Sequence, residues 1–238
     1  MLRKTKTLLL SALVFSIALI SFPLAAKSVE NDFGLWTAIN INAPITDKVQ
    51  SRFQISPRWL DDVTDFNQFI LHGLLGYKFN KYVSFYQGYA WSTLYIPNFR
   101  REQRPYQELL FFHNIDKLSF EHRFRLDERF MQDVDGVSMR ARYRIKGSYP
   151  LGMSKKWSLI MFDELFVILN SKDDGPQAGI DQNRTYIGIN RKLNENMNID
   201  LGYQLQQIHR PGSLYERLNH FVFFYLNFDL PKLVSNKN

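Results

Sequence analysis

The segment from Leu118 to Phe130, LSFEHRFRLDERF, is the part of the chain that most constrains the fold. Its apolar side chains alternate with polar ones, and successive side chains of a strand point to opposite faces. One face is therefore mainly apolar, and the other carries five charges. A strand of a soluble sandwich rarely has so unbroken a row of ions over about 9 to 11 residues, the length that crosses a bilayer. The pattern indicates a strand of a transmembrane barrel, with lipid outside and a wet or salt-bridged lumen inside.

The beginning of the chain has the three parts of a secretory signal peptide. Three cations precede an apolar run from Leu8 to Ile20, and the small pair Ala25 and Ala26 follows it. An uncleaved membrane anchor is the alternative, but a spanning helix needs about 20 apolar residues. We expect cleavage near Ala26, with residues 1–26 as the signal peptide and residues 27–238 as an outer-membrane barrel domain. No later apolar run is long enough for a spanning helix, so the mature chain would cross a membrane as strands.

The composition excludes several kinds of site and partner. The chain has no cysteine, so disulfides, a lipid-modified N-terminal cysteine and thiolate metal sites cannot form. Without the three signal-peptide cations, 27 Lys and Arg face 23 Asp and Glu, a mild and dispersed excess that does not indicate nucleic-acid binding. Aromatic residues make up 15% of the chain, which suits the aromatic girdles of a membrane barrel. We expect no cofactor, and as partners outer-membrane lipid and the barrel-assembly machinery; the oligomeric state stays open.

Turn-forming and charged segments divide the mature chain into eleven strand-like pieces, each near the length that a tilted strand needs to cross a bilayer. The fold class that they predict is all-β: a transmembrane, antiparallel, up-and-down β-barrel of about 10 to 12 strands. An odd number conflicts with the even strand count of bacterial barrels, so either one boundary is misplaced or the first strand is atypical. The pieces are residues 33–41, 49–60, 67–78, 82–93, 106–115, 118–130, 139–151, 157–170, 184–193, 197–207 and 218–230.

The connections between these pieces alternate in length. Membrane barrels have short periplasmic turns and longer outer loops. This rule places the start of the first strand on the outer side and the end of the last strand, at Phe228, on the periplasmic side. The tight turns are residues 79–81, 116–117, 152–156 and 194–196, and the long connections are 94–105, 131–138, 171–183 and 208–217.

The pieces with the clearest alternation place a cluster of charges on the inner wall of the barrel. In residues 49–60 and 139–151, cations alternate with apolar side chains as they do in residues 118–130. The predicted lumen charge cluster consists of Arg52, Arg58, Glu121, Arg123, Arg125, Asp127, Arg129, Arg140, Arg142, Arg144 and Lys146.

The charge balance of this cluster decides between a plug and a pore. Cations predominate, and a closed lumen would need further carboxylates to pair with them, for which Glu108, Glu164 and Asp200 are candidates. The sequence does not show which way Glu108, Asp163 and Glu164 point, because their strands are apolar on both faces. A lumen without enough carboxylates would hold water and attract anions. We favour a salt-bridged, largely plugged lumen over a narrow anion-conducting pore, because barrels of about 8 to 12 strands leave little interior space.

An outer-membrane lipid hydrolase is the alternative from a different class. His220 begins the last strand with Ser213 and Glu216 before it, so the three can be arranged as a Ser, His and acid set. A histidine beside hydroxyls is common at a membrane interface without chemistry, and fold alone confers no activity. The acidic loop at residues 173–181 lacks the order of an EF-hand calcium site. We therefore predict no catalytic, cofactor or metal residues and a non-enzymatic barrel of unassigned specific role.

Five motifs together resemble the family called domain of unknown function 2490. The resemblance extends from about residue 32 to residue 230 and rests on the order and spacing of the motifs. It implies an outer-membrane barrel of Gram-negative bacteria, exported through the periplasm, and no established activity. The motifs are DFGLW at 32–36, RFRLDER at 123–129, RARYRI at 140–145, DQNRTYIGI at 181–189 and DLGYQLQ at 200–206.

Overall fold

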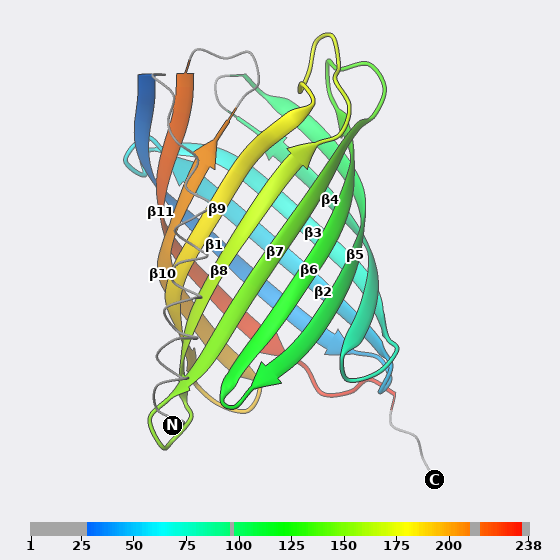
Figure 1. Ribbon diagram of the computed structural model, residues 1–238, viewed down its shortest axis with the longest axis vertical. Coiled ribbons are helices and arrows are strands. Elements are labelled where there is room, and N and C mark those ends of the chain that lie inside the picture. The colour runs from blue at the N-terminus through cyan, green and yellow to red at the C-terminus, as the bar shows by residue number, and fades with distance from the viewer. Residues whose placement is uncertain (1–27, 96–97, 210–214, 235–238) are drawn as a thin grey trace, which may run out of the picture.

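The computed structural model describes residues 28–95, 98–209 and 215–234, so the predicted signal peptide and its cleavage site lie outside the described residues. Eleven strands follow one another around a closed barrel (Figure 1), which confirms the all-β fold and the predicted strand number. Within the described ranges, no helix is long and apolar enough to cross a membrane. The strands are β1 (Ser28–Pro44), β2 (Val49–Leu60), β3 (Asp65–Lys78), β4 (Val83–Leu94), β5 (Arg100–Ile115), β6 (Leu118–Met131), β7 (Ser138–Leu151), β8 (Trp157–Ile168), β9 (Gly179–Lys192), β10 (Met197–Ile208) and β11 (Tyr215–Asp229).

The barrel closes between its first and last strands in a parallel pair. All other neighbours are antiparallel and consecutive in the sequence. In the closing pair, β1 and β11 run in the same direction, with Trp36 opposite Phe223 and Ile41 opposite Phe228. The predicted antiparallel, up-and-down order therefore holds for every neighbouring pair except this seam. An up-and-down barrel with an odd number of strands must contain one parallel pair, because its first and last strands point the same way.

The two ends of the barrel differ in the length of their connections. β1 and β11 both begin at the end with the longer connections, which is the upper end in Figure 1. All four predicted long connections are shorter between the observed strands, most clearly where β5 already begins at Arg100, β9 at Gly179 and β11 at Tyr215. The described connections at the upper end are residues 61–64, 132–137 and 169–178, and those at the lower end are residues 45–48, 79–82, 116–117, 152–156 and 193–196.

Side chains alternate between the outer surface and the lumen along the strands. Large apolar residues such as Phe124 and Leu201 are 48% and 47% exposed on the outer surface, whereas Tyr106 and Phe166 are buried inside the barrel. The interior therefore serves as the core, where aromatic rings and charged groups share one space. Its main apolar cluster consists of Trp36, Ile160, Tyr186, Phe221 and Phe223.

Candidate functional site in the lumen

The lumen holds a cavity of about 860 Å³. Ten of the eleven residues in the predicted lumen charge cluster line this cavity. The eleventh, Asp127, is fully buried against the guanidinium groups of three of the others. The cluster comes from β6 and β7, which are neighbours, and from β2 on the other side of the ring.

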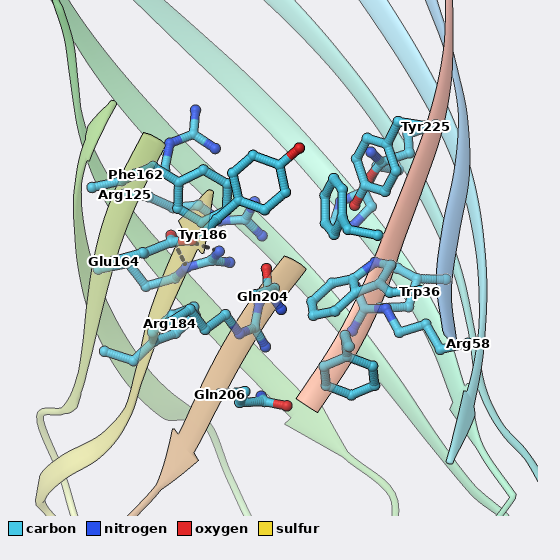
Figure 2. A pocket seen from close by; sticks show the side chains of 18 of the residues that line it. Trp36, Arg58, Arg125, Phe162, Glu164, Arg184, Tyr186, Gln204, Gln206 and Tyr225 are labelled. Carbon is cyan, nitrogen blue, oxygen red and sulfur yellow. Dashed lines mark hydrogen bonds and ion pairs between the residues drawn. The ribbon is translucent and has the colours of Figure 1, made fainter. Parts of the chain in front are cut away.

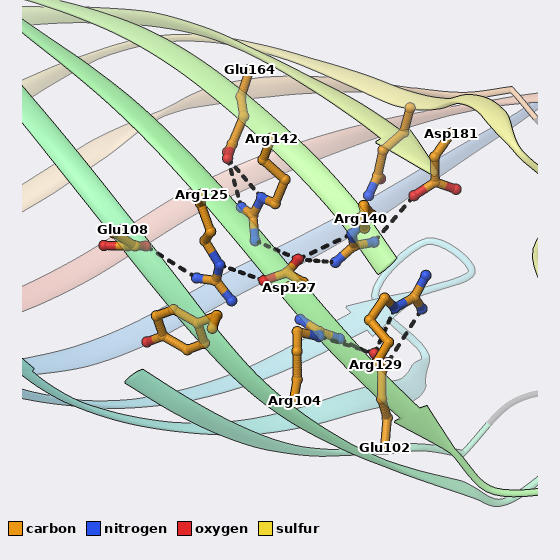
Figure 3. A network of polar contacts seen from close by, with 12 residues as sticks. Glu102, Arg104, Glu108, Arg125, Asp127, Arg129, Arg140, Arg142, Glu164 and Asp181 are labelled. Atoms are coloured by element: carbon orange, nitrogen blue, oxygen red, sulfur yellow. Dashed lines mark hydrogen bonds and ion pairs between the residues drawn. The ribbon is translucent and has the colours of Figure 1, made fainter. Parts of the chain in front are cut away.

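Asp127 is the centre of an ion-pair network on the wall formed by β5 to β9 (Figure 3). Its Oδ1 lies 2.5 Å from Arg125 Nε and its Oδ2 lies 2.9 Å from Arg140 Nη2. Arg142 Nη1 is 3.6 Å from the same Oδ2. The β6–β7 register produces this arrangement, because it pairs Asp127 with Arg140 and Arg125 with Arg142. One carboxylate thus lies among three guanidiniums.

Glu108 and Glu164, whose directions the sequence left open, both face the lumen and extend the network. Glu164 Oε1 lies 2.7 Å from Arg123 Nη2 and 2.7 Å from Arg142 Nη2. Glu108 Oε1 lies 3.4 Å from Arg123 Nη1 and 3.3 Å from Arg125 Nη1. Each carboxylate therefore bridges two arginines, which stabilises buried ions far better than a single contact does.

Two other acidic residues lie outside this network. Asp163 is on the opposite face of β8 from Glu164, where its carboxylate accepts hydrogen bonds from Asn183 Nδ2 at 3.0 Å and Thr185 Oγ1 at 2.8 Å. Asp200 lines the cavity, but it accepts hydrogen bonds from two asparagine amides and not from an arginine. The suggestion that Asp200 pairs with cations of the lumen charge cluster is therefore wrong.

Three network members, Glu102, Arg104 and Asp181, were missed because they fall in segments predicted to be loops. Glu102 Oε2 lies 2.7 Å from Arg104 Nη2, and Glu102 Oε1 lies 2.7 Å from Arg129 Nε. Asp181 Oδ2 lies 3.1 Å from Arg140 Nη1. Alternation at residues 102, 104, 106 and 108 was an available signal that β5 begins early.

Tyr106 fixes the position of the Arg125 guanidinium. The guanidinium carbon of Arg125 lies 3.5 Å from the centroid of the Tyr106 ring, within the range of a cation–π contact. The ring occupies space over Gly88 on β4, where an added Cβ would lie 2.2 Å from a ring atom. Any side chain at position 88 would displace the Tyr106 ring. Gly88 on β4 therefore helps to hold Tyr106, and through it Arg125, in place.

Another part of the wall, mainly from β1, β2, β10 and β11, is lined by amides. Asn40 Nδ2 donates to Asn227 Oδ1 at 2.7 Å, and Gln54 Nε2 donates to Asn40 Oδ1 at 2.6 Å. Gln206 donates to Gln182 on β9. The ion pairs are thus concentrated on one sector of the ring, and neutral polar groups line much of the rest.

Some lumen cations have no carboxylate partner. Glu121 Oε1 lies 2.5 Å from Arg144 Nη2. Lys146 is opposite Glu121 on β7 but forms no ion pair with it. Among the described residues, four cations that line the cavity have no carboxylate oxygen within 4.0 Å: Arg52, Arg58, Lys146 and Arg184. The three arginines of this group donate to the amide oxygens of Asn42, Gln68 and Gln182.

His220 and Glu216, the two described residues considered for hydrolase chemistry, contact different partners. His220 Nδ1 lies 2.6 Å from the hydroxyl of Tyr203, and Glu216 Oε1 lies 3.0 Å from His209 Nδ1. Ser213 lies outside the described residues. In the part of the chain that the structure describes, no group of three or more His, Asp or Glu side chains is arranged to hold a metal ion.

Comparison with known proteins gives this barrel a family. The sequence model of the family described as Protein of unknown function (DUF2490) matches residues 33–217. The chain belongs to the DUF2490 family. The resemblance that the five motifs indicated is therefore confirmed, over a region that runs from β1 into β11.

Two further comparisons concern single proteins. An uncharacterised protein of Methylorubrum extorquens strain AM1 is 28% identical to this DUF2490 chain over 230 residues, which cover 93% of this chain and 96% of the relative. A solved structure of the NanC porin is similar over 77% of this chain and 89% of that chain, with 11% identity and a TM-score of 0.49. The family description states no activity.

Proposed function

We propose that this DUF2490 protein is a non-enzymatic outer-membrane barrel whose lumen is largely plugged by salt bridges. The observation that carries the proposal is the network around Asp127, in which buried arginines from β6 and β7 meet carboxylates from β5, β6, β8 and β9. The apolar outer surface supports a lipid environment, because charged side chains are costly on the lipid face of a barrel. The predicted signal peptide supports export through the periplasm.

The unequal ends of the barrel support an orientation within this proposal. Outer-membrane barrels have short periplasmic turns and longer extracellular loops. The end with residues 132–137 and 169–178 is therefore the extracellular end, and β1 and β11 both begin there. Outer-membrane lipid and the barrel-assembly machinery are the partners that such a chain requires.

A narrow path for anions is the second candidate function, and one observation favours it. Twelve Lys and Arg side chains line the cavity against six Asp and Glu side chains, and buried Asp127 adds one more carboxylate. A wet lumen with this excess presents a positive field to anions. The ion network narrows such a path from one side without removing the excess charge.

Cell fractionation tests the location. We expect the protein in the outer-membrane fraction, and we expect the unboiled protein to migrate faster on a gel than the boiled protein. Recovery in the soluble periplasm without a heat-dependent shift in migration would contradict the outer-membrane barrel.

Planar-bilayer conductance of the refolded protein separates the two candidates. A plugged lumen gives no stable current steps in the wild type. Anion-selective steps that fall in an Arg142→Glu variant would favour the pore. Arg191→Glu is the matched control, because it makes the same charge change at an exposed residue near the lower end of β9.

A further inference from the structure

Arg58 and Arg184 bring two positive charges to one indole ring inside the lumen. The guanidinium carbon of Arg58 lies 3.3 Å from the ring centroid of Trp36, and that of Arg184 lies 4.7 Å from it. Arg58 belongs to β2 and Arg184 to β9, so the two side chains come from separate parts of the barrel wall. In Figure 2, Arg184 extends from one side of the lumen, Trp36 and Arg58 from the other, and Gln204 lies between them.

No carboxylate oxygen of the described residues lies within 4.0 Å of either guanidinium, and the carboxylates of Glu164 and Asp181 act on Arg184 only from farther away. Arg58 Nη1 donates to Gln68 Oε1 at 2.8 Å and Arg184 Nη2 donates to Gln182 Oε1 at 3.3 Å, and both acceptors are neutral amides. The Nε atoms of both arginines are buried and have no hydrogen-bond partner among the described residues. Arg125, by contrast, contacts two carboxylates. Two like charges without a direct ion-pair partner repel each other, and a bound anion would offset that repulsion.

The surroundings of this pair fit an organic anion better than a bare inorganic ion. Gln204 is 1% exposed and its Nε2 has no hydrogen-bond partner among the described residues, so a buried donor is available there. Phe221 and Phe223 pack against Trp36 with ring centroids 5.5 and 5.9 Å from it. These rings offer an apolar surface beside the cationic groups, and cavities of about 300–1,000 Å³ suit small ligands.

We infer that the lumen of this barrel contains a binding site for a small organic carboxylate. Arg58 and Arg184 hold the carboxylate, Gln204 donates a further hydrogen bond, and Trp36 with its neighbouring rings packs against the body of the ligand. Guanidinium groups suit this role because their planar donors match the geometry of a carboxylate. This site goes beyond the proposed function, and the two share only the requirement that the chain folds into a barrel.

Binding of benzoate to the full chain, refolded in detergent, tests the site by isothermal titration calorimetry. Benzamide is the matched neutral probe, because it has the same ring and nearly the same shape without the charge. We expect benzoate to bind at least about tenfold more tightly than benzamide, since hydrogen bonds to charged groups are the stronger ones. We also expect saturating benzoate, and not benzamide, to raise the thermal unfolding midpoint.

Substitutions locate the site. Arg58→Gln and Arg184→Gln should each weaken benzoate binding about tenfold or more. Arg52→Gln is the matched control, because Arg52 also lacks a carboxylate partner but makes no ring contact with Trp36 in the structure, and its affinity should stay within about twofold of wild type. Arg58→Lys keeps the charge and should retain more affinity than Arg58→Gln, which separates charge from packing.

Three results would overturn the inference. These are equal binding of benzoate and benzamide, unchanged benzoate affinity in both glutamine variants, and no benzoate binding to a wild-type barrel that shows the heat-dependent shift in migration. Tighter binding of sulfate than of benzoate would also contradict an organic carboxylate as the ligand. None of these results bears on the outer-membrane location, which fails only in the fractionation experiment.

Discussion

Replacing Asp127 by alanine removes the carboxylate at the centre of the lumen network. Its oxygens lie 2.5 Å from Arg125, 2.9 Å from Arg140 and 3.6 Å from Arg142, and the residue is 0% exposed. Breaking a buried ion pair by removing one partner costs about 3 to 5 kcal/mol. Each of the three arginines keeps one other carboxylate, so we expect the lower part of this range, about 3 kcal/mol.

Urea unfolding of the chain refolded in lipid vesicles measures this loss, with the four tryptophans as the fluorescence signal. The dependence of unfolding free energy on urea is about 1–3 kcal/mol per molar for small proteins. A loss of about 3 kcal/mol therefore lowers the unfolding midpoint by about 1 M or more. Asp127→Asn should lower it less than Asp127→Ala, because the amide oxygen still accepts a hydrogen bond from an arginine.

Asp47→Ala is the matched control, because it removes an aspartate from an exposed ion pair. Asp47 Oδ1 lies 2.8 Å from Lys232 Nζ, and the Asp47 side chain is 74% exposed. Such pairs contribute about 0–1 kcal/mol. Equal midpoints for Asp47→Ala and Asp127→Ala would refute the reasoning, since they would mean that water in the lumen screens the Asp127 contacts as bulk solvent does.

Three further predictions concern the faces, the packing and the seam of the barrel. Phe124→Arg should reduce the yield of heat-modifiable barrel far more than Phe124→Leu, because a cation on the lipid face costs about 2–4 kcal/mol; equal yields would contradict the outward position. Gly88→Val should lower the urea midpoint, because the added side chain would displace the Tyr106 ring. Gly73→Val should leave the midpoint unchanged, because no atom lies within 4 Å of its added Cβ, and similar midpoints for the two variants would count against the tight contact at Gly88. Leu35→Cys combined with Val222→Cys should form a disulfide on oxidation, detected by a gel shift reversed by reductant, because the two are partners in the parallel pair; no cross-link would argue against this closure.

Local alternation was sufficient to predict the strands with one apolar and one charged face. In residues 118–130 the side chains on one face are charged and those on the other are mainly apolar, so the period of two assigns Phe124 to the outside and Arg125 to the lumen. Strand β8 is apolar on both faces, and there the same method could not orient Glu164. Its direction follows only from the register with β7, which pairs it with Arg144.

The missed network residues have two separate physical causes. Glu102 and Arg104 lie on a part of β5 that is rich in charge, and charged segments without apolar partners look like loops in a sequence. Asp181 lies beside a register shift between Phe166 and Val167 on the neighbouring strand. An irregularity of this kind disrupts the period of two, so alternation does not predict the side on which Asp181 lies.

The closing pair was beyond any local pattern, because it joins the two strands that are farthest apart in the sequence. Alternation in β1 and in β11 is compatible with either direction of pairing, and only the strand number and the connections constrain the choice. Eleven strands with the first and last both starting at the same end of the barrel leave the parallel pair as the single way to close the ring.

The two kinds of arginine in the lumen differ in their neighbours and not in their own strands. Arg58 and Arg125 are both inward cations on alternating strands, and the sequence gives no reason to separate them. The register places Glu108 opposite Arg125, whereas it places Trp36 opposite Arg58. The first arginine is thereby neutralised within the protein, and the second is left with an aromatic ring and an amide. The register of two paired strands determines which side chains lie opposite each other at every position. One sector of the barrel wall therefore holds an ion network, and another holds a cationic site without a direct ion-pair partner.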